Sequence, residues 1–168
     1  MTTMIRSLLF AGALALGSAL AHAETALEKL RVPPGFTIEL WAQVDNPRAM
    51  TLGAPGRLYV GSRAGHVSAV AFDPATMTAG KAVRIAEQLN MPVGVAWRKG
   101  DLYVSSLDRI VKLPAIDDRL AAPPKPVLVS DRFPKESAHG WKFIAFGPDG
   151  KLYVPVGAPC NICDRDKD

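Results

Sequence analysis

A five-residue phrase that recurs three times limits the folds this chain can adopt. The phrase has the form Gly-X-Leu-Tyr-Val and occupies residues 56–60, 100–104 and 150–154, at offsets of 44 and 50 residues. Each copy follows a short apolar run and a turn, at residues 49–55, 93–99 and 143–149. This pattern predicts a strand, a tight turn and a second strand in every copy.

Further apolar runs of strand length follow the first two copies, at residues 66–72, 83–86, 109–113 and 126–130. Each repeat therefore holds about four short strands at the roughly 40–50-residue period of a β-propeller blade. We expect an all-β fold with about three propeller blades. The alternative is a β-sandwich with repeated hairpins. The only helix that we expect covers residues 24–31, ahead of Pro33-Pro34.

The N-terminus has the pattern of an export signal. A basic start at residues 1–6 precedes an apolar run at 7–20 and the small-residue site Ala21-His22-Ala23. We therefore expect residues 1–23 to be removed and residues 24–168 to form the N-terminal part of a propeller domain in the periplasm. The apolar run is shorter than the roughly 20 residues of a spanning helix. No later segment approaches that length, so we expect no transmembrane anchor after signal removal.

Composition and length narrow the classes of protein further. The chain is 48% apolar and 21% charged, as in globular proteins, and its net charge of +4 comes from basic residues scattered along it. This scatter argues against nucleic acid as a partner. Because propellers close with roughly 4–8 blades, three blades predict the N-terminal part of a longer protein. We interpret Thr37 to Val44 as a lone strand that completes the last blade.

Both cysteines belong to one group, Cys160-Asn161-Ile162-Cys163. An exported chain meets an oxidising compartment, which favours a local disulfide between Cys160 and Cys163. Covalent haem attachment is excluded because Asp164 stands where a histidine would have to follow the second cysteine. A zinc site, which needs two more ligands, and a redox role stay open as minor alternatives.

His139 is the candidate catalytic residue, in the loop that enters the first strand of the third repeat. Such loops gather at one end of a propeller axis, and an imidazole titrates near neutral pH, as a general base must. Gly140 permits close approach of a ligand and Trp141 offers a stacking surface. Lys142 faces either the channel or the solvent.

The other candidates have structural interpretations. We expect Arg63 and His66 to lie in a solvated hairpin turn and Asp117-Asp118 to be loop charges. Trp41, Trp97 and the three repeat tyrosines are predicted to pack in the core or between blades.

The stretch from His139 to Val154, His-Gly-Trp-Lys-Phe-Ile-Ala-Phe-Gly-Pro-Asp-Gly-Lys-Leu-Tyr-Val, continues to Val156-Gly157. It resembles the soluble quinoprotein sugar dehydrogenases of the glucose/sorbosone dehydrogenase family. Residues 158–164 are similar to the sorbosone dehydrogenase-like branch, and residues 30–36 are similar to the mature start of that branch.

The resemblance implies a six-bladed propeller that binds pyrroloquinoline quinone (PQQ) and calcium and oxidises a sugar or sugar aldehyde. It implies that His139 is the general base, that Gly140, Trp141 and Lys142 contact the cofactor, and that a periplasmic acceptor takes the electrons. We assign no metal ligand, because the family's calcium ligands come from later blades. The family's histidine is commonly supported by an Asp where this chain has Ala158, so Asp164 or another group is expected to serve.

Two alternatives to an enzyme remain at this point. The first is a non-catalytic propeller that binds a ligand or a protein at the same channel mouth, since a fold does not settle a function. The second is an inactive truncated fragment.

Overall fold

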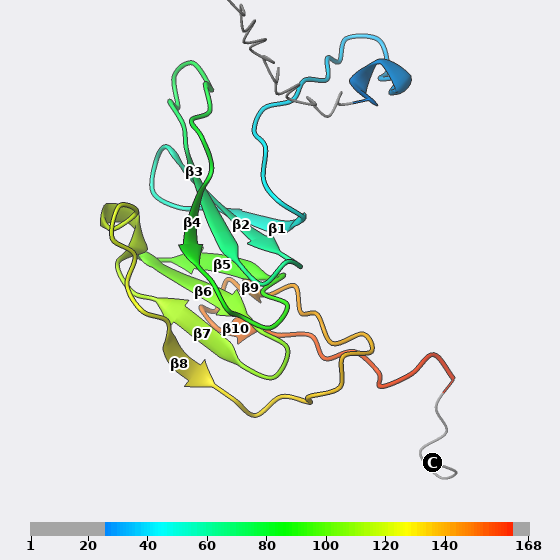
Figure 1. The fold of residues 1–168 in the computed structure, drawn as a ribbon, viewed down its shortest axis with the longest axis vertical. Coiled ribbons are helices and arrows are strands. Elements are labelled where there is room, and N and C mark those ends of the chain that lie inside the picture. The colour runs from blue at the N-terminus through cyan, green and yellow to red at the C-terminus, as the bar shows by residue number, and fades with distance from the viewer. Residues whose placement is uncertain (1–25, 163–168) are drawn as a thin grey trace, which may run out of the picture. The chain divides into compact units, whose positions relative to one another are not determined.

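The computed structural model describes residues 26–162, which form an all-β fold (Figure 1). This confirms the predicted all-β class, while the propeller stays a prediction. The helix expected over residues 24–31 is reduced, in the described part, to one 3-10 turn, η1 (Ala26–Lys29). The chain divides into two units, Met1–Glu39 and Leu40–Asp168, and every sheet belongs to the second. The predicted leader, residues 1–23, lies outside the described residues.

The strands form three antiparallel sheets in chain order. The first sheet contains β1 (Pro47–Leu52), β2 (Arg57–Ser62), β3 (Val67–Ala71) and β4 (Val83–Ala86). The second contains β5 (Val95–Arg98), β6 (Asp101–Ser105), β7 (Ile110–Leu113) and β8 (Val127–Ser130). The third is the hairpin of β9 (Ala145–Phe146) and β10 (Leu152–Tyr153). Each of the first two repeats thus forms the predicted four-stranded sheet.

A hairpin is built in each of the three repeats, and the glycine of the repeated phrase has the same conformation in each copy. The φ angles of Gly56, Gly100 and Gly150 are 78°, 88° and 78°. In this left-handed region a Cβ would be strained, so glycine suits the turn. The turn sets the register of the two strands. As a result, the repeat leucine pairs with Leu52, Trp97 or Phe146 on the preceding strand.

The second sheet is covered on both faces. Leu102 and Val104 of β6 are fully buried in one cluster with Tyr59 and other residues of the first sheet. Tyr103, between them, turns to the opposite face, as successive strand residues must. Its ring packs edge-on against Phe146, with the ring centroids 5.0 Å apart. The three sheets therefore stack in the order of the repeats (Figure 1).

The prediction that Asp117 is merely a loop charge is wrong, because its side chain links the first two sheets. It lies in the 3-10 turn η2 (Ile116–Asp118), which follows β7. Its Oδ1 accepts hydrogen bonds from the Tyr59 hydroxyl at 2.7 Å and from the backbone N–H of Ala54 at 3.2 Å. Its Oδ2 accepts one from Trp97 Nε1 at 2.8 Å. Three donors from two sheets thus converge on one half-buried carboxylate.

One further local prediction is wrong and another stays a prediction. Residues 37–44 are not part of a sheet among the described residues, and the last blade that they are expected to complete is not among those residues either, so the lone strand stays a prediction. His66 is not in a solvated turn: it is 3% exposed, because it directly precedes β3, whose first four residues are buried.

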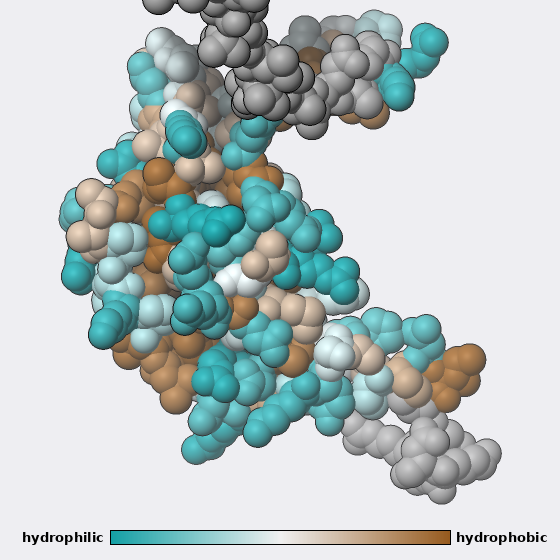
Figure 2. Space-filling view, in the orientation of Figure 1, coloured by the Kyte–Doolittle hydropathy of each residue, from teal (hydrophilic) through white to brown (hydrophobic). Residues whose placement is uncertain are grey.

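Apolar side chains remain exposed where strands lie at sheet edges. On β8 the residues Val127, Leu128 and Val129 are 47%, 54% and 46% exposed, and they form an apolar patch over this strand (Figure 2). On β10 the repeat tyrosine Tyr153 is 57% exposed, whereas Tyr59 is fully buried. The prediction that all three repeat tyrosines are packed is therefore wrong for Tyr153, whose strand has only β9 beside it among the described residues.

The buried Tyr59 makes stability depend on pH in the alkaline range. Burial, with the hydrogen bond to Asp117, raises the pKa of its hydroxyl above the usual value. Because the pKa is higher in the folded than in the unfolded state, Tyr59 stabilises the fold at pH values below the unfolded-state pKa of about 10. This stabilisation is lost as the pH rises above that value. We expect the difference in unfolding free energy between wild type and Tyr59→Phe, measured in urea, to shrink above about pH 10. Tyr153→Phe, at an exposed position, should show no such trend, and a constant difference for Tyr59→Phe would contradict the prediction.

Candidate functional site

The segments that lead into the first strands of the three repeats lie side by side. We call residues 45–49, 92–94 and 139–144 the entry segments. The backbone N–H of Ala49 donates to the carbonyl oxygen of Val93 at 3.2 Å, which joins the first two. Ser105 Oγ donates to the carbonyl oxygen of Lys142 at 2.8 Å, and a Cβ on Gly94 would collide with that same oxygen. The second and third entry segments are therefore in direct backbone contact.

The third entry segment alternates between exposed and buried side chains. Gly140, Lys142 and Ile144 are buried, whereas Trp141 and Phe143 are 39% and 52% exposed and His139 is half-buried. The four predicted site residues are therefore divided between two pockets. His139, Gly140 and Lys142 line one, and Trp141 lines the other.

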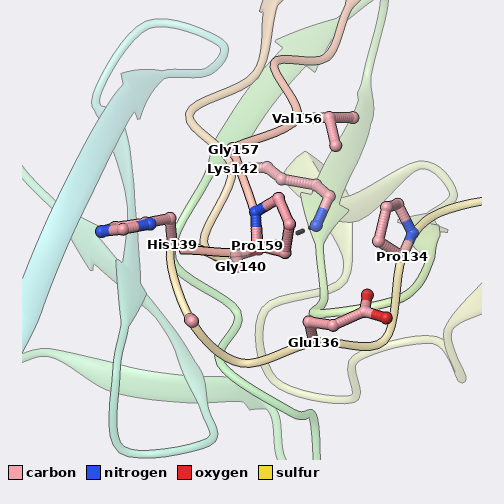
Figure 3. Close-up of a pocket in the computed structure, with 9 residues that line it drawn as sticks. Pro134, Glu136, His139, Gly140, Lys142, Val156, Gly157 and Pro159 are labelled. Carbon is pink, nitrogen blue, oxygen red and sulfur yellow. Dashed lines mark hydrogen bonds between the residues drawn. The ribbon is translucent and has the colours of Figure 1, made fainter. Parts of the chain in front are cut away.

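The imidazole of His139 is held in one tautomer. Its Nδ1 lies 3.0 Å from the carbonyl oxygen of Ala158. A carbonyl oxygen can only accept, so Nδ1 carries a hydrogen, and in the neutral ring Nε2 then has the lone pair. The ring points away from Lys142 and Glu136 (Figure 3). His139 thus presents a proton-accepting nitrogen, the atom a general base requires.

The backbone around His139 is strained and closely packed. Its φ angle is 49°, a conformation that residues other than glycine adopt mainly where the surrounding structure imposes it. Gly157 lies against it, and a Cβ there would be 2.8 Å from the Cβ of His139 and would collide with its carbonyl oxygen. The close approach of Gly157 brings the next residue, Ala158, to the ring. A backbone carbonyl therefore orients the histidine, and Asp164 lies outside the described residues.

Lys142 anchors the loop that carries His139. The residue is 2% exposed, and its ammonium donates to the carbonyl oxygens of Leu107 at 2.5 Å and Gly140 at 2.7 Å. Burial lowers the pKa of Lys142, and the charge of Asp108 opposes this effect. Lys142 also lines a pocket of about 250 Å³ together with Glu136, His139 and Gly140 (Figure 3). Contact of Gly140 and Lys142 with a cofactor stays a prediction.

A second pocket, of about 260 Å³, opens on the other face of the third entry segment. We call it the arginine pocket, and its lining is Arg48, Arg63, Val93, Trp141 and Phe143. The Arg63 guanidinium lies 5.3 Å from the centroid of the Trp141 ring. Arg63 is exposed, as its hairpin position predicted, but it is stacked on a candidate site residue.

Sequence reasoning did not find the arginine pocket. A signal was present in the repeats, because Arg48 stands four residues before Leu52 and Val93 stands four before Trp97, at equivalent places in the first two copies. Leu52 and Trp97 are the residues that pair with the repeat leucines. Aligning the copies on those leucines would have placed Arg48 beside Val93.

The structure bears only in part on the predictions about metal ligands, membrane spans and the disulfide. Within residues 26–162 no group of three or more His, Cys, Asp or Glu side chains is arranged to hold a metal ion. In the same range no helix is long and apolar enough to cross a membrane. Cys160 is described but Cys163 is not, so their disulfide stays a prediction.

Comparison with known proteins gives little functional information. No family model matches the chain. Over 152 residues it is 24% identical to an uncharacterized protein of Borreliella burgdorferi, a match that covers 83% of this chain and 38% of that protein. The chain thus spans less than half the length of this relative.

Proposed function

We propose that this chain is the N-terminal part of a periplasmic β-propeller quinoprotein that oxidises a sugar or sugar aldehyde with PQQ, with His139 as the general base. The observation that carries the proposal is the state of His139. It lies on an entry segment that contacts the next, and its Nε2 lone pair is left free by the bond to Ala158. The resemblance of residues 139–157 to quinoprotein sugar dehydrogenases supplies the reaction class.

The stacking of the repeats supports the proposal of a propeller. The first strands β1 and β5 are in contact, and so are β5 and β9, as expected for innermost strands of successive blades around an axis. Both ends of the stack carry uncovered apolar side chains: Met50 and Leu52 of β1 are each 64% exposed, and Tyr153 is 57% exposed. Further blades of a longer protein would cover these faces.

In the proposed reaction, His139 removes one proton from the substrate. PQQ, when bound, supplies the acceptor for the hydride that leaves the substrate carbon. Nε2 of His139 takes the hydroxyl proton, and the C–O bond becomes a carbonyl. The bond from Nδ1 to Ala158 keeps the ring in place while it becomes positively charged, and the charged ring can return the proton to solvent.

The described residues fit a flat organic cofactor better than they fit calcium. The exposed face of Trp141 offers a stacking surface for a planar ring system, and the adjoining pocket is open. For calcium, the described residues include no cluster of carboxylates of the kind that binds this ion. We derive no step through calcium.

Binding of PQQ tests the proposed function. The complete gene product, freed of metals and cofactor, should bind PQQ in the presence of calcium in a saturable manner with one site per chain. Calorimetry measures this directly. If a well-folded protein shows no heat of binding, the enzyme proposal fails and a non-catalytic binding propeller takes its place.

A further inference from the structure

The arginine pocket combines positive charge with aromatic and apolar walls. Two guanidinium groups, of Arg48 and Arg63, line it together with Trp141, Phe143 and Val93, and its lining contains no acidic residue. Its volume of about 260 Å³ suits a molecule of monosaccharide size, since drug-sized ligands fill about 300–1,000 Å³.

The two guanidinium groups lack a negative partner in the described part of the chain. Arg84, Arg109 and Lys112 each form an ion pair with a neighbouring carboxylate, whereas neither Arg48 nor Arg63 forms one within residues 26–162. Two cations on one small pocket repel each other. An anion bound between them would remove this repulsion.

The pocket is ordered before any ligand binds. The backbone N–H of Arg63 donates to the carbonyl oxygen of Asn46 at 3.2 Å, and Ser62 Oγ donates to that of Asp45 at 2.8 Å, so the end of β2 is fixed to the first entry segment. Arg48 Nη1 donates to the carbonyl oxygen of Pro47 at 3.0 Å. The Arg63 guanidinium lies over the Trp141 ring, and a planar carboxylate can accept two hydrogen bonds from a guanidinium.

The pocket is close in sequence to the candidate general base. Trp141, which lines the arginine pocket, is two residues from His139, which lines the neighbouring pocket of about 250 Å³. A ligand with its anionic group on the arginines would therefore bind against the entry segment that carries His139.

We propose that the arginine pocket binds the carboxylate of a small ligand and that Arg63 and Arg48 determine this specificity. Resting on the proposed function, the inference identifies the ligand as a sugar acid, whose carboxylate makes the substrate anionic.

Calorimetric titrations of the complete gene product test this assignment. D-glucuronate is the anionic sugar probe, D-glucose its neutral counterpart, and PQQ the cofactor probe. Glucuronate should bind at least tenfold more tightly than glucose, and Arg63→Gln and Arg48→Gln should each abolish the preference. If the same variants instead weaken PQQ binding at least tenfold and leave both sugars unaffected, the pocket serves the cofactor and the inference is overturned.

The matched control is Arg84→Gln, which removes an exposed arginine of β4 outside the pocket. It should alter none of the three affinities. If glucuronate, glucose and PQQ all bind alike to wild type, Arg48→Gln and Arg63→Gln, the inference is overturned. Because binding is measured without turnover, the pocket can hold a carboxylate even if the proposed oxidation fails, so the two failures are distinguishable.

Discussion

Replacing His139 by glutamine should lower the turnover of the complete gene product by about 10²–10⁴-fold, the usual contribution of a general base. The glutamine side chain retains polarity but has no nitrogen basic enough to accept the substrate proton. The affinity for PQQ should change little, because the imidazole acts on the substrate hydroxyl. Dye reduction at saturating PQQ and sugar measures the loss.

Glu136→Gln is the matched control for this variant. Glu136 lines the neighbouring pocket, but the His139 ring points away from it (Figure 3). Turnover of the Glu136→Gln protein should stay near that of wild type. Near-normal turnover of the His139→Gln protein would show that another group accepts the proton.

Asp117→Ala should destabilise the fold by about 3 kcal/mol, because it leaves three donors from two sheets without an acceptor. These are the Tyr59 hydroxyl, Trp97 Nε1 and the backbone N–H of Ala54. Each half-buried donor that loses its partner costs about 1 kcal/mol or more. Unfolding in urea, followed by tryptophan fluorescence, measures the change in free energy.

The neighbour Asp118 provides the comparison for Asp117. It is exposed and accepts no hydrogen bond from the first sheet, so Asp118→Ala should change the unfolding free energy by less than about 0.5 kcal/mol. Equal losses in the two alanine variants would show that the interaction between the sheets through Asp117 is unimportant.

The hairpins could be predicted because their causes are local. The glycine of each Gly-X-Leu-Tyr-Val phrase has a positive φ in the structure, and the apolar runs on either side of the turn form the paired strands. The third repeat illustrates the limit of such reasoning. Residues 143–146 were predicted as a strand, yet only Ala145 and Phe146 pair, since their partner β10 is itself two residues long.

The rest of the site depends on contacts between residues far apart in the sequence. In the sequence, Asp117 cannot be distinguished from other loop aspartates, because only the stacking of the sheets brings Tyr59 to it. Arg63 lies next to Trp141 only because three entry segments converge. The hydrogen bond between His139 and Ala158 could not be predicted either, because every residue has a backbone carbonyl and the sequence does not show which one a side chain contacts.

The central claim is that His139 serves a PQQ-dependent oxidation, and the most direct test is dye reduction by the complete gene product with glucose, sorbosone and glucuronate, with and without PQQ and calcium. The proposed function predicts reduction that requires both a sugar and PQQ and that is lost in the His139→Gln protein. A folded protein that binds PQQ and reduces no dye with any of these sugars would contradict it.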